Sequence, residues 1–141
     1  MAYKTVWLVK DRVLLSTFSG IITQPELESF IAEVRSEIAK GRPLVHHISD
    51  SLGLEKLELS IKTFRSLLSA YKMIGELGWQ VDVNKNSLNK MLSGLGAQFV
   101  RIRARTFASM EEAVNFLKEI DPTLANEVWE SSTDRADTVS V

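Results

Sequence analysis

Cysteine is absent from the 141 residues, and its absence excludes several kinds of chemistry. Without a thiol, the chain cannot form a disulfide, a thiolate zinc site, an iron–sulfur cluster or a cysteine nucleophile. A chain that folds without disulfides is most simply explained as a protein of a reducing compartment. We therefore expect a cytoplasmic protein.

Long apolar runs and an excess of charge of one sign are also missing. No run approaches the roughly 18 apolar residues of a membrane-spanning helix. Lysine and arginine number 17 against 18 aspartates and glutamates, which gives a net charge of −1. Such a chain has no overall field that attracts nucleic acid or anionic lipid. We expect neither membrane insertion nor a nucleic acid partner.

What is present fits one globular domain. Hydrophobic residues make up 45% and charged residues 25%, which are ordinary values for a folded domain, and the length suits one domain of about 150 residues. The apolar pattern weakens after Asp121, and residues 131–141 are polar and short-chained. We expect the domain to cover residues 1–125, with 126–141 as a C-terminal extension that is flexible from residue 131.

The apolar periodicity predicts strands and helices in the order ββαβαβαβα. The predicted strands cover residues 3–9, 12–19, 44–48, 79–83 and 98–107. The predicted helices follow Thr23, Ser60, Asn86 and Ser109, with capping boxes at the first and the last, and residues 49–58 are polar and turn-rich. Right-handed crossovers then give an α/β fold with a mixed, mostly parallel five-stranded sheet. The helices are expected mainly on one face, leaving the other thinly covered.

Two stretches of the chain resemble a known family. In residues 10–23, Gly20 ends a strand just before a capped helix; in residues 100–117, Phe107 closes a strand and Glu111-Glu112-Ala113 opens a helix. These stretches are similar to the STAS or SpoIIAA-like family, over roughly residues 3–120. The resemblance implies a SpoIIAA-like domain that works as a non-enzymatic regulatory or protein–protein interaction module. We expect no cofactor and no metal.

The resemblance also points to a phosphorylation switch. Anti-sigma-factor antagonists of this family carry a phosphorylatable serine at the start of the second helix, in an Asp-Ser-Ser/Thr-Gly phrase. Ser60 matches by position but lacks the flanking Asp and Gly, whereas Ser51 lies in the similar phrase Asp50-Ser51-Leu52-Gly53, which comes earlier. Ser60 and Ser51 are therefore the switch candidates. Their alternatives are a plain N-cap and a turn residue.

An interaction surface is predicted from two further groups of residues. Arg101, Arg103 and Arg105 alternate along the last predicted strand, so their guanidinium groups share one face. They could bind an acidic partner or a phosphate, or they could form a solvated face that protects the strand edge. Asp50 and Leu54, ahead of the second helix, complete the predicted surface.

The histidines and the tryptophans leave further alternatives open. His46 and His47 are adjacent in a strand and point to opposite faces, which argues against a shared metal site or a hydrolase triad. Trp7 and Trp79 either fill the core or form an exposed patch for a homodimer or another partner. The alternative function is a carrier that holds a lipid or another apolar small molecule between sheet and helices; an enzyme of unknown chemistry is a third.

Overall fold

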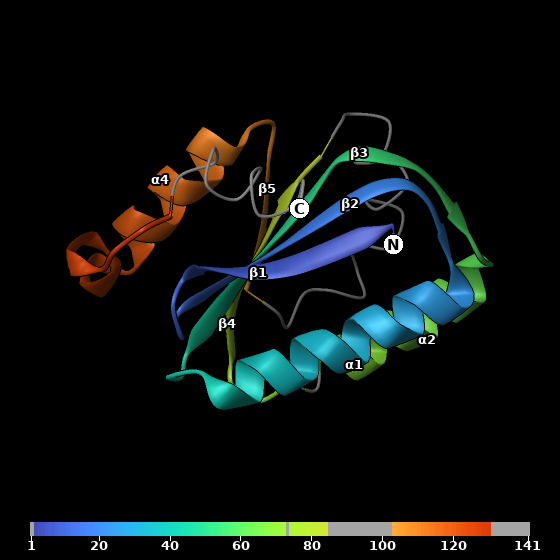
Figure 1. Cartoon of the computed structure of the whole chain (residues 1–141), viewed down its shortest axis with the longest axis horizontal. Helices are drawn as coiled ribbons and strands as arrows, with labels where there is room; N and C mark the ends of the chain where they lie inside the picture. Colours follow the sequence, from blue (N-terminus) through green and yellow to red (C-terminus); the bar gives the residue numbers. More distant parts are fainter. Residues whose placement is uncertain (1, 73, 85–102, 131–141) are drawn as a thin grey trace.

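The computed structural model describes residues 2–72, 74–84 and 103–130, and its elements follow the predicted order (Figure 1). They are β1 (Tyr3–Val9), β2 (Val13–Thr23), α1 (Gln24–Lys40), β3 (Val45–Glu58), α2 (Ile61–Lys72), β4 (Leu77–Val83), β5 (Ala104–Phe107), α4 (Met110–Ile120) and the 3-10 turn η2 (Pro122–Asn126). The helix predicted after Asn86 and the first part of the last predicted strand lie outside the described residues.

The five strands form one sheet in the order β1-β2-β3-β4-β5. β1 and β2 are antiparallel, and the other neighbours are parallel, so the predicted mixed, mostly parallel sheet is confirmed. The β1–β2 hairpin turns through Asp11, which adopts a left-handed backbone with φ 66°. This is a conformation that aspartate tolerates better than most residues.

Helix α1 begins and packs as its sequence predicts. The Thr23 side chain accepts a hydrogen bond from the Glu26 backbone, and the Glu26 carboxylate accepts one from the Thr23 backbone, which completes the capping box. Gly41 follows the helix where a Cβ would lie 2.7 Å from the carbonyl oxygen of Asp11. The predicted apolar stripe is buried against the sheet: Leu27, Phe30, Ile31, Val34 and Ile38.

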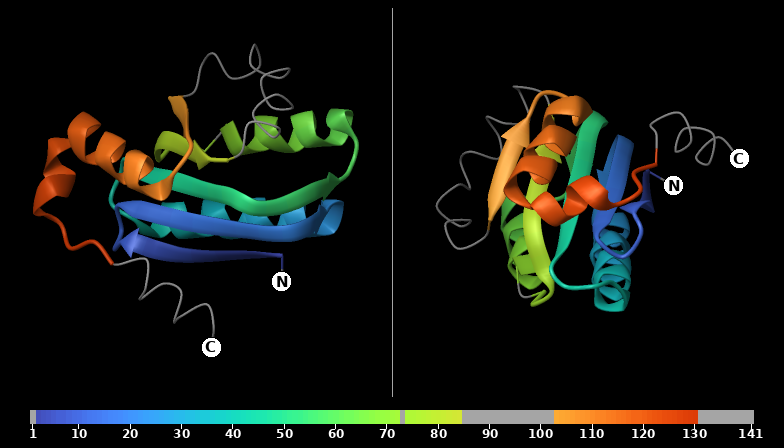
Figure 2. Two further views of the ribbon diagram at one scale, coloured as in Figure 1. Left: turned by 90° about the horizontal axis from the view of Figure 1, so that it is seen from above. Right: turned by 90° about the vertical axis from the view of Figure 1, so that its left-hand side faces the viewer.

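Both faces of the sheet carry a hydrophobic core. Helices α1 and α2 lie on one face, as predicted, and α4 and η2 lie on the other (Figures 1 and 2). Ala113, Leu117 and Leu124 are fully buried in the core of this second face, so at this end the face is not thinly covered. The crossover rule constrains helices that join parallel strands. Because no described strand follows α4, the rule does not fix its face.

The third strand is much longer than predicted. β3 runs through Glu58, so the prediction of a turn-rich segment at residues 49–58 is wrong. β4 pairs with β3 only as far as Asp50, and beyond that point β3 pairs with β2 alone among the described strands, ending with Thr23 opposite Glu58. We call residues 19–23 and 51–58 the distal ribbon. It curves toward the starts of α1 and α2 (Figure 1).

Candidate functional site

The distal ribbon holds two of the predicted site residues, Ser51 and Leu54, and it is kinked by irregular pairing. The register shifts after Thr17 and again after Gly20, and at each shift β3 contributes one more residue than β2. Gly20 takes a left-handed backbone with φ 67° at the second shift, a conformation that favours glycine. Bulges of this kind increase strand twist, which accounts for the curve of the ribbon.

Asp50, Ser51 and Leu54 lie within β3, not in a loop as predicted. Asp50 ends the pairing with β4, and its carboxylate accepts a hydrogen bond from the Leu52 backbone at 3.1 Å. Ser51 is half-buried in the strand. Leu54 is also half-buried and packs against the core beneath α1 and α2. Of the three, Leu54 therefore contributes mainly to folding.

Two large apolar side chains are exposed at this end of the molecule. Ile21 in the distal ribbon is 47% exposed, and Ile61 at the start of α2 is 53% exposed. The nearby residues Ile22 and Phe64 belong to the hydrophobic core or pack against it, whereas Ile21 and Ile61 do not. An apolar surface that stays in water is favourable to bury against another molecule. Sequence periodicity alone did not single out either residue.

Ser60 has the geometry of an N-cap and an exposed side chain. Its Oγ accepts a hydrogen bond from the Thr63 backbone at 3.1 Å and donates one to Thr63 Oγ1 at 2.9 Å. The first turn of α2 carries no acidic residue. The free amides and the positive end of the helix dipole would stabilise a phosphate at this position. Ser60 thus lies at a helix start, as predicted, in a place that accommodates negative charge.

The two described arginines of the predicted stripe contact the protein itself. The Arg103 guanidinium donates a hydrogen bond to the carbonyl oxygen of Leu77 at 3.4 Å. The Arg105 guanidinium lies over the ring of Phe116 in α4, 5.4 Å from its centroid. Neither forms an ion pair within the part of the chain that the structure describes. Arg101 lies outside the described residues.

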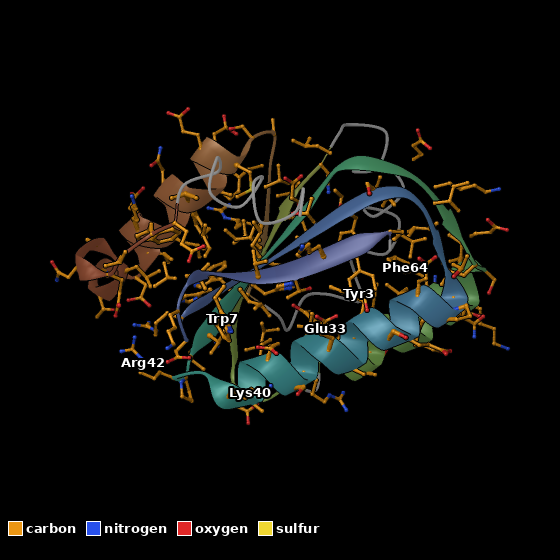
Figure 3. The ribbon with its side chains drawn as sticks, viewed as in Figure 1. Tyr3, Trp7, Glu33, Lys40, Arg42 and Phe64 are labelled. Carbon is orange, nitrogen blue, oxygen red and sulfur yellow. The ribbon has the colours of Figure 1, made fainter. Side chains whose placement is uncertain are left out.

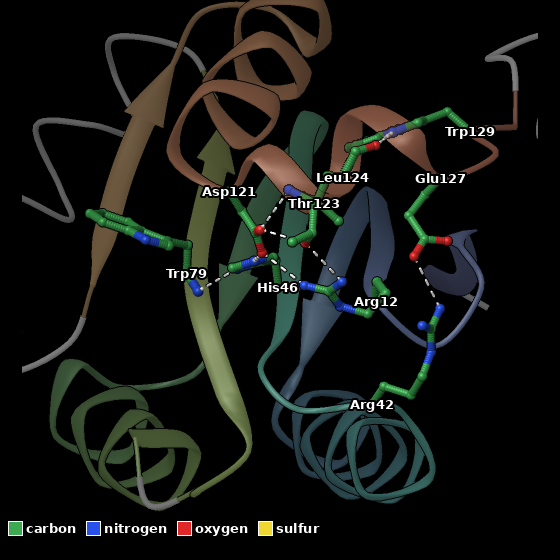
Figure 4. A network of polar contacts seen from close by, with 9 residues as sticks. All are labelled: Arg12, Arg42, His46, Trp79, Asp121, Thr123, Leu124, Glu127 and Trp129. Atoms are coloured by element: carbon green, nitrogen blue, oxygen red, sulfur yellow. Dashed lines mark hydrogen bonds and ion pairs between the residues drawn. The ribbon is translucent and has the colours of Figure 1, made fainter.

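A charged junction ties the C-terminal segment to the sheet (Figure 4). Asp121 Oδ2 lies 3.0 Å from His46 Nε2 and 2.8 Å from Arg12 Nη2, and Arg12 also donates to Thr123 at 3.1 Å. The Trp79 backbone donates to His46 Nδ1 at 2.9 Å. Because Nδ1 accepts this bond, the proton of neutral His46 lies on Nε2 and is donated to Asp121.

The junction shifts the acidity of its members. Burial alone would raise the pKa of Asp121, but hydrogen bonds from His46 and Thr123 and the charge of Arg12 lower it to about 2. Burial is the main cause that lowers the pKa of His46, and the carboxylate of Asp121 opposes it. At neutral pH the junction therefore holds a neutral histidine between a carboxylate and a backbone amide.

A second polar network is buried under α1 and α2. The Nε2 of His47 lies 2.8 Å from the Ser16 hydroxyl, and its Nδ1 lies 2.8 Å from the Gln80 side-chain oxygen and 2.7 Å from the Tyr71 hydroxyl. The Tyr71 hydroxyl donates to the same Gln80 oxygen. The Gln80 amide then donates to Asp82 at 2.8 Å. One chain of hydrogen bonds thus links β2, β3, β4 and α2.

Burial dominates the acidity of this network. It lowers the pKa of His47 to about 4 and raises the pKa of Asp82 to about 6. It also raises the pKa of Tyr71. Ser16 is 0% exposed and His47 1% exposed, so a substrate could reach their contact only if the core opened. The arrangement is suited to fixing strand register and not to catalysis.

The sequence did not reveal this network as a unit. His46 and His47 do point to opposite faces, as predicted, but both are buried. The sequence feature that could have revealed the network is a set of polar residues on one face of otherwise apolar strands: Thr5, Ser16, His47, Ser49, Gln80 and Asp82. Seeing them as one cluster requires the register of four strands. Among the described residues, no group of three or more metal-ligating side chains is placed to hold an ion.

Comparison with known proteins identifies the fold. No protein-family model matches the chain, and no curated protein matches it. An uncharacterised DUF3478-family protein with a SpoIIAA-like fold from Shewanella loihica PV-4 is similar in structure, with a TM-score of 0.60 and 15% identity over 82% of this chain and 94% of that one.

The anti-sigma factor antagonist SpoIIAA is similar as well. Its unphosphorylated form matches with a TM-score of 0.59 and 13% identity, over 84% of this chain and 97% of that one. The phosphorylated form of the Bacillus cell fate determinant SpoIIAA matches with a TM-score of 0.55 and 16% identity, over 82% of this chain and 99% of that one. This protein therefore has the SpoIIAA-like fold that its sequence predicted.

Proposed function

We propose that this protein is a non-enzymatic regulatory module that binds another protein through the end of the molecule that carries the distal ribbon and the start of α2. The observation that carries the proposal is the exposure of two large apolar side chains at this end, Ile21 in the distal ribbon and Ile61, which directly follows the N-cap Ser60. The fold is shared with an anti-sigma factor antagonist that has been described in phosphorylated and unphosphorylated forms. That similarity supports a regulatory role.

Phosphorylation of Ser60 is the proposed means of regulation. The hydroxyl is exposed, and the first turn of α2 contains no acidic side chain that would repel a phosphate. A phosphate would place about two negative charges beside Ile61. Because this apolar side chain has to be desolvated when a partner binds, the added charge would weaken the complex.

The arrangement of the described polar groups favours binding over catalysis. The contact between Ser16 and His47 is sealed in the core. No helix in the described part of the chain is both long and apolar enough to cross a membrane. The carrier alternative draws no support from the described residues, since both faces of the sheet are filled by side chains.

Quantitative affinity capture from the native host tests the proposal. The wild type is compared with the double variant Ile21→Asp/Ile61→Asp and with a matched control, Ile120→Asp/Val128→Asp, whose side chains are 46% and 84% exposed in the C-terminal part of the chain. We expect one protein, captured in stoichiometric amount, to be lost only with the first variant and with Ser60→Asp. Equal capture by all four baits would contradict the proposed surface.

A further inference from the structure

Strand β1 is the outermost of the described strands on its side of the sheet. The strand order ends at β1, and no described strand pairs with its outer side. The Ser19 backbone donates to the carbonyl of Ala2, and Tyr3 lies opposite Phe18. In an antiparallel pair these contacts alternate. The backbone N–H and C=O groups of Tyr3, Thr5 and Trp7 therefore point away from β2.

The far end of this edge is already in use. The pairing with β2 shifts register between Trp7 and Val9, and the Leu8 carbonyl accepts a hydrogen bond from the Glu130 backbone at 3.0 Å. The chain itself thus pairs with the edge at Leu8. The outward-facing backbone groups of Tyr3, Thr5 and Trp7, which no described strand pairs with, span a stretch of about 16 Å at roughly 3.3 Å per residue.

Helix α1 places a row of carboxylates beside this stretch (Figure 3). Glu26 Oε2 accepts from the Ala2 backbone at 3.4 Å, and Glu37 Oε2 accepts from the Trp7 indole at 3.1 Å. Glu33 lies between them near the Tyr3 hydroxyl, where, together with burial, it raises the pKa of Tyr3. All three carboxylates come from the flank of α1 that faces β1, and all three are only half-buried.

The other side of the same edge is partly apolar. Lys4 and Val6 alternate with Tyr3, Thr5 and Trp7 and so point away from α1, and Val6 packs against the second core, which also contains Leu8 and Trp129. An added strand would pair residues opposite Tyr3, Thr5 and Trp7, and their side chains would project toward the glutamates of α1. The residues between them would project toward Lys4 and Val6. The edge therefore selects for basic residues at alternate positions, with an apolar residue between them where the added strand faces Val6.

The spacing of the carboxylates suits this alternation. Glu33 and Glu37 are separated by four helical residues, a rise of about 6 Å. Two residues of an extended strand span about 6.6 Å. Basic side chains at alternate positions of a bound strand would thus meet successive carboxylates. Lys40 pairs with Glu37 at 3.4 Å, but its side chain is 65% exposed, so it can yield to a partner cation at little cost.

We propose that the outer edge of β1 binds an extended basic segment of a partner protein by strand addition. The backbone of Tyr3, Thr5 and Trp7 supplies the hydrogen bonds, and Glu33 and Glu37 select lysine or arginine at alternate positions. This surface includes none of Ile21, Ser60 and Ile61, so the proposal does not depend on the proposed function. A second copy of this chain is a poorer occupant, because pairing β1 with β1 would bring two acidic rows together.

Fluorescence anisotropy with a labelled peptide tests the proposal. The probe is a seven-residue peptide that alternates lysine and valine. It is compared with a peptide that alternates glutamate and valine and with the lysine–valine peptide N-methylated at every backbone nitrogen, which cannot donate a backbone hydrogen bond to β1. We expect saturable binding of the first peptide alone, weakened by added salt. Binding of the acidic or the N-methylated peptide with equal affinity would overturn strand addition at an acidic edge.

Matched variants locate the binding. Glu33→Gln/Glu37→Gln removes two charges, and the amide oxygen that replaces the Glu37 carboxylate can still accept from the Trp7 indole; Glu28→Gln/Glu55→Gln removes two charges elsewhere. We expect about tenfold weaker binding for the first variant and no change for the second. Equal losses would mean nonspecific charge attraction and would refute the site. A variant truncated after Glu130 tests whether the peptide binds to residues 131–141 instead. We expect this variant to bind the peptide as the wild type does, and loss of binding would refute the site on β1.

Discussion

Replacing His47 by glutamine should make the stability of the protein less sensitive to acid. His47 is 1% exposed and takes part in the buried network through Ser16, Tyr71 and Gln80. Glutamine is close in size and can keep one of these hydrogen bonds. It cannot keep all of them, so we expect His47→Gln to be about 1–3 kcal/mol less stable than the wild type at pH 7.5.

The pH dependence follows from the lowered pKa of this histidine. In the folded protein the pKa of His47 is about 4, against an ordinary value of 6.5 that applies to the unfolded chain. As pH falls from 6.5 to 4, the unfolded chain takes up a proton that the folded protein does not, so stability declines. At about 1.4 kcal/mol per pH unit, His47 accounts for a loss of about 3 kcal/mol. The His47→Gln variant does not show this loss of stability, because glutamine does not titrate.

Urea denaturation followed by tryptophan fluorescence measures the difference. We expect the difference in the free energy of unfolding between wild type and His47→Gln to decrease by about 2–3 kcal/mol between pH 7.5 and pH 4.5. Carboxylates titrate in both proteins, so their effects largely cancel in the difference. His46→Gln serves as the control with a smaller narrowing, because Asp121 opposes the lowering of the His46 pKa. A gap that stays constant with pH would refute the buried neutral histidine.

Three further predictions concern stability. Asp121→Asn should remove about 1–2 kcal/mol of stability at pH 6, since the pKa of Asp121 is about 2 in the folded protein. The wild type should lose this contribution between pH 4 and pH 2, where the carboxylate is protonated. If Asp121→Asn is still less stable than the wild type by the same amount at pH 2, the prediction is contradicted. Gly41→Ala should cost about 1–3 kcal/mol because its Cβ would meet the Asp11 carbonyl oxygen and the Val45 side chain at 2.7 Å, while Gly75→Ala, with open space around it, is the control; equal melting temperatures would disprove the clash. Ser60→Ala should cost about 1 kcal/mol as a lost N-cap, whereas Ser60→Asp should keep the cap; thermal melts that rank the two in the opposite order would contradict the Ser60–Thr63 geometry.

Local signals in the sequence predicted the elements whose own residues determine them. The capping box at Thr23 and Glu26 and the apolar stripe of α1 involve only neighbours within a few turns, and both are confirmed. The mixed, mostly parallel character of the sheet followed from the alternation of strands and helices and from crossover handedness. The family resemblance then gave the right fold.

Features that depend on partners distant in sequence were missed. The second half of β3 contains Ser51 and Gly53, which are typical of turns, but pairing with β2 holds it as a strand. Asp121 ends α4 and gives no sign in sequence of its contact with His46, 75 residues away. In the same way, the contact of Arg105 with Phe116 depends on which face α4 covers.

The most direct test of the proposed function is site-specific photocrosslinking in the native host. A photoreactive residue is placed either at Ile61, 53% exposed at the start of α2, or at Ile120, 46% exposed at the end of α4. The proposed function predicts one discrete protein adduct from position 61, absent from position 120 and lost when Ser60→Asp is added. Adducts of the same size from both positions, or from position 120 alone, would contradict it.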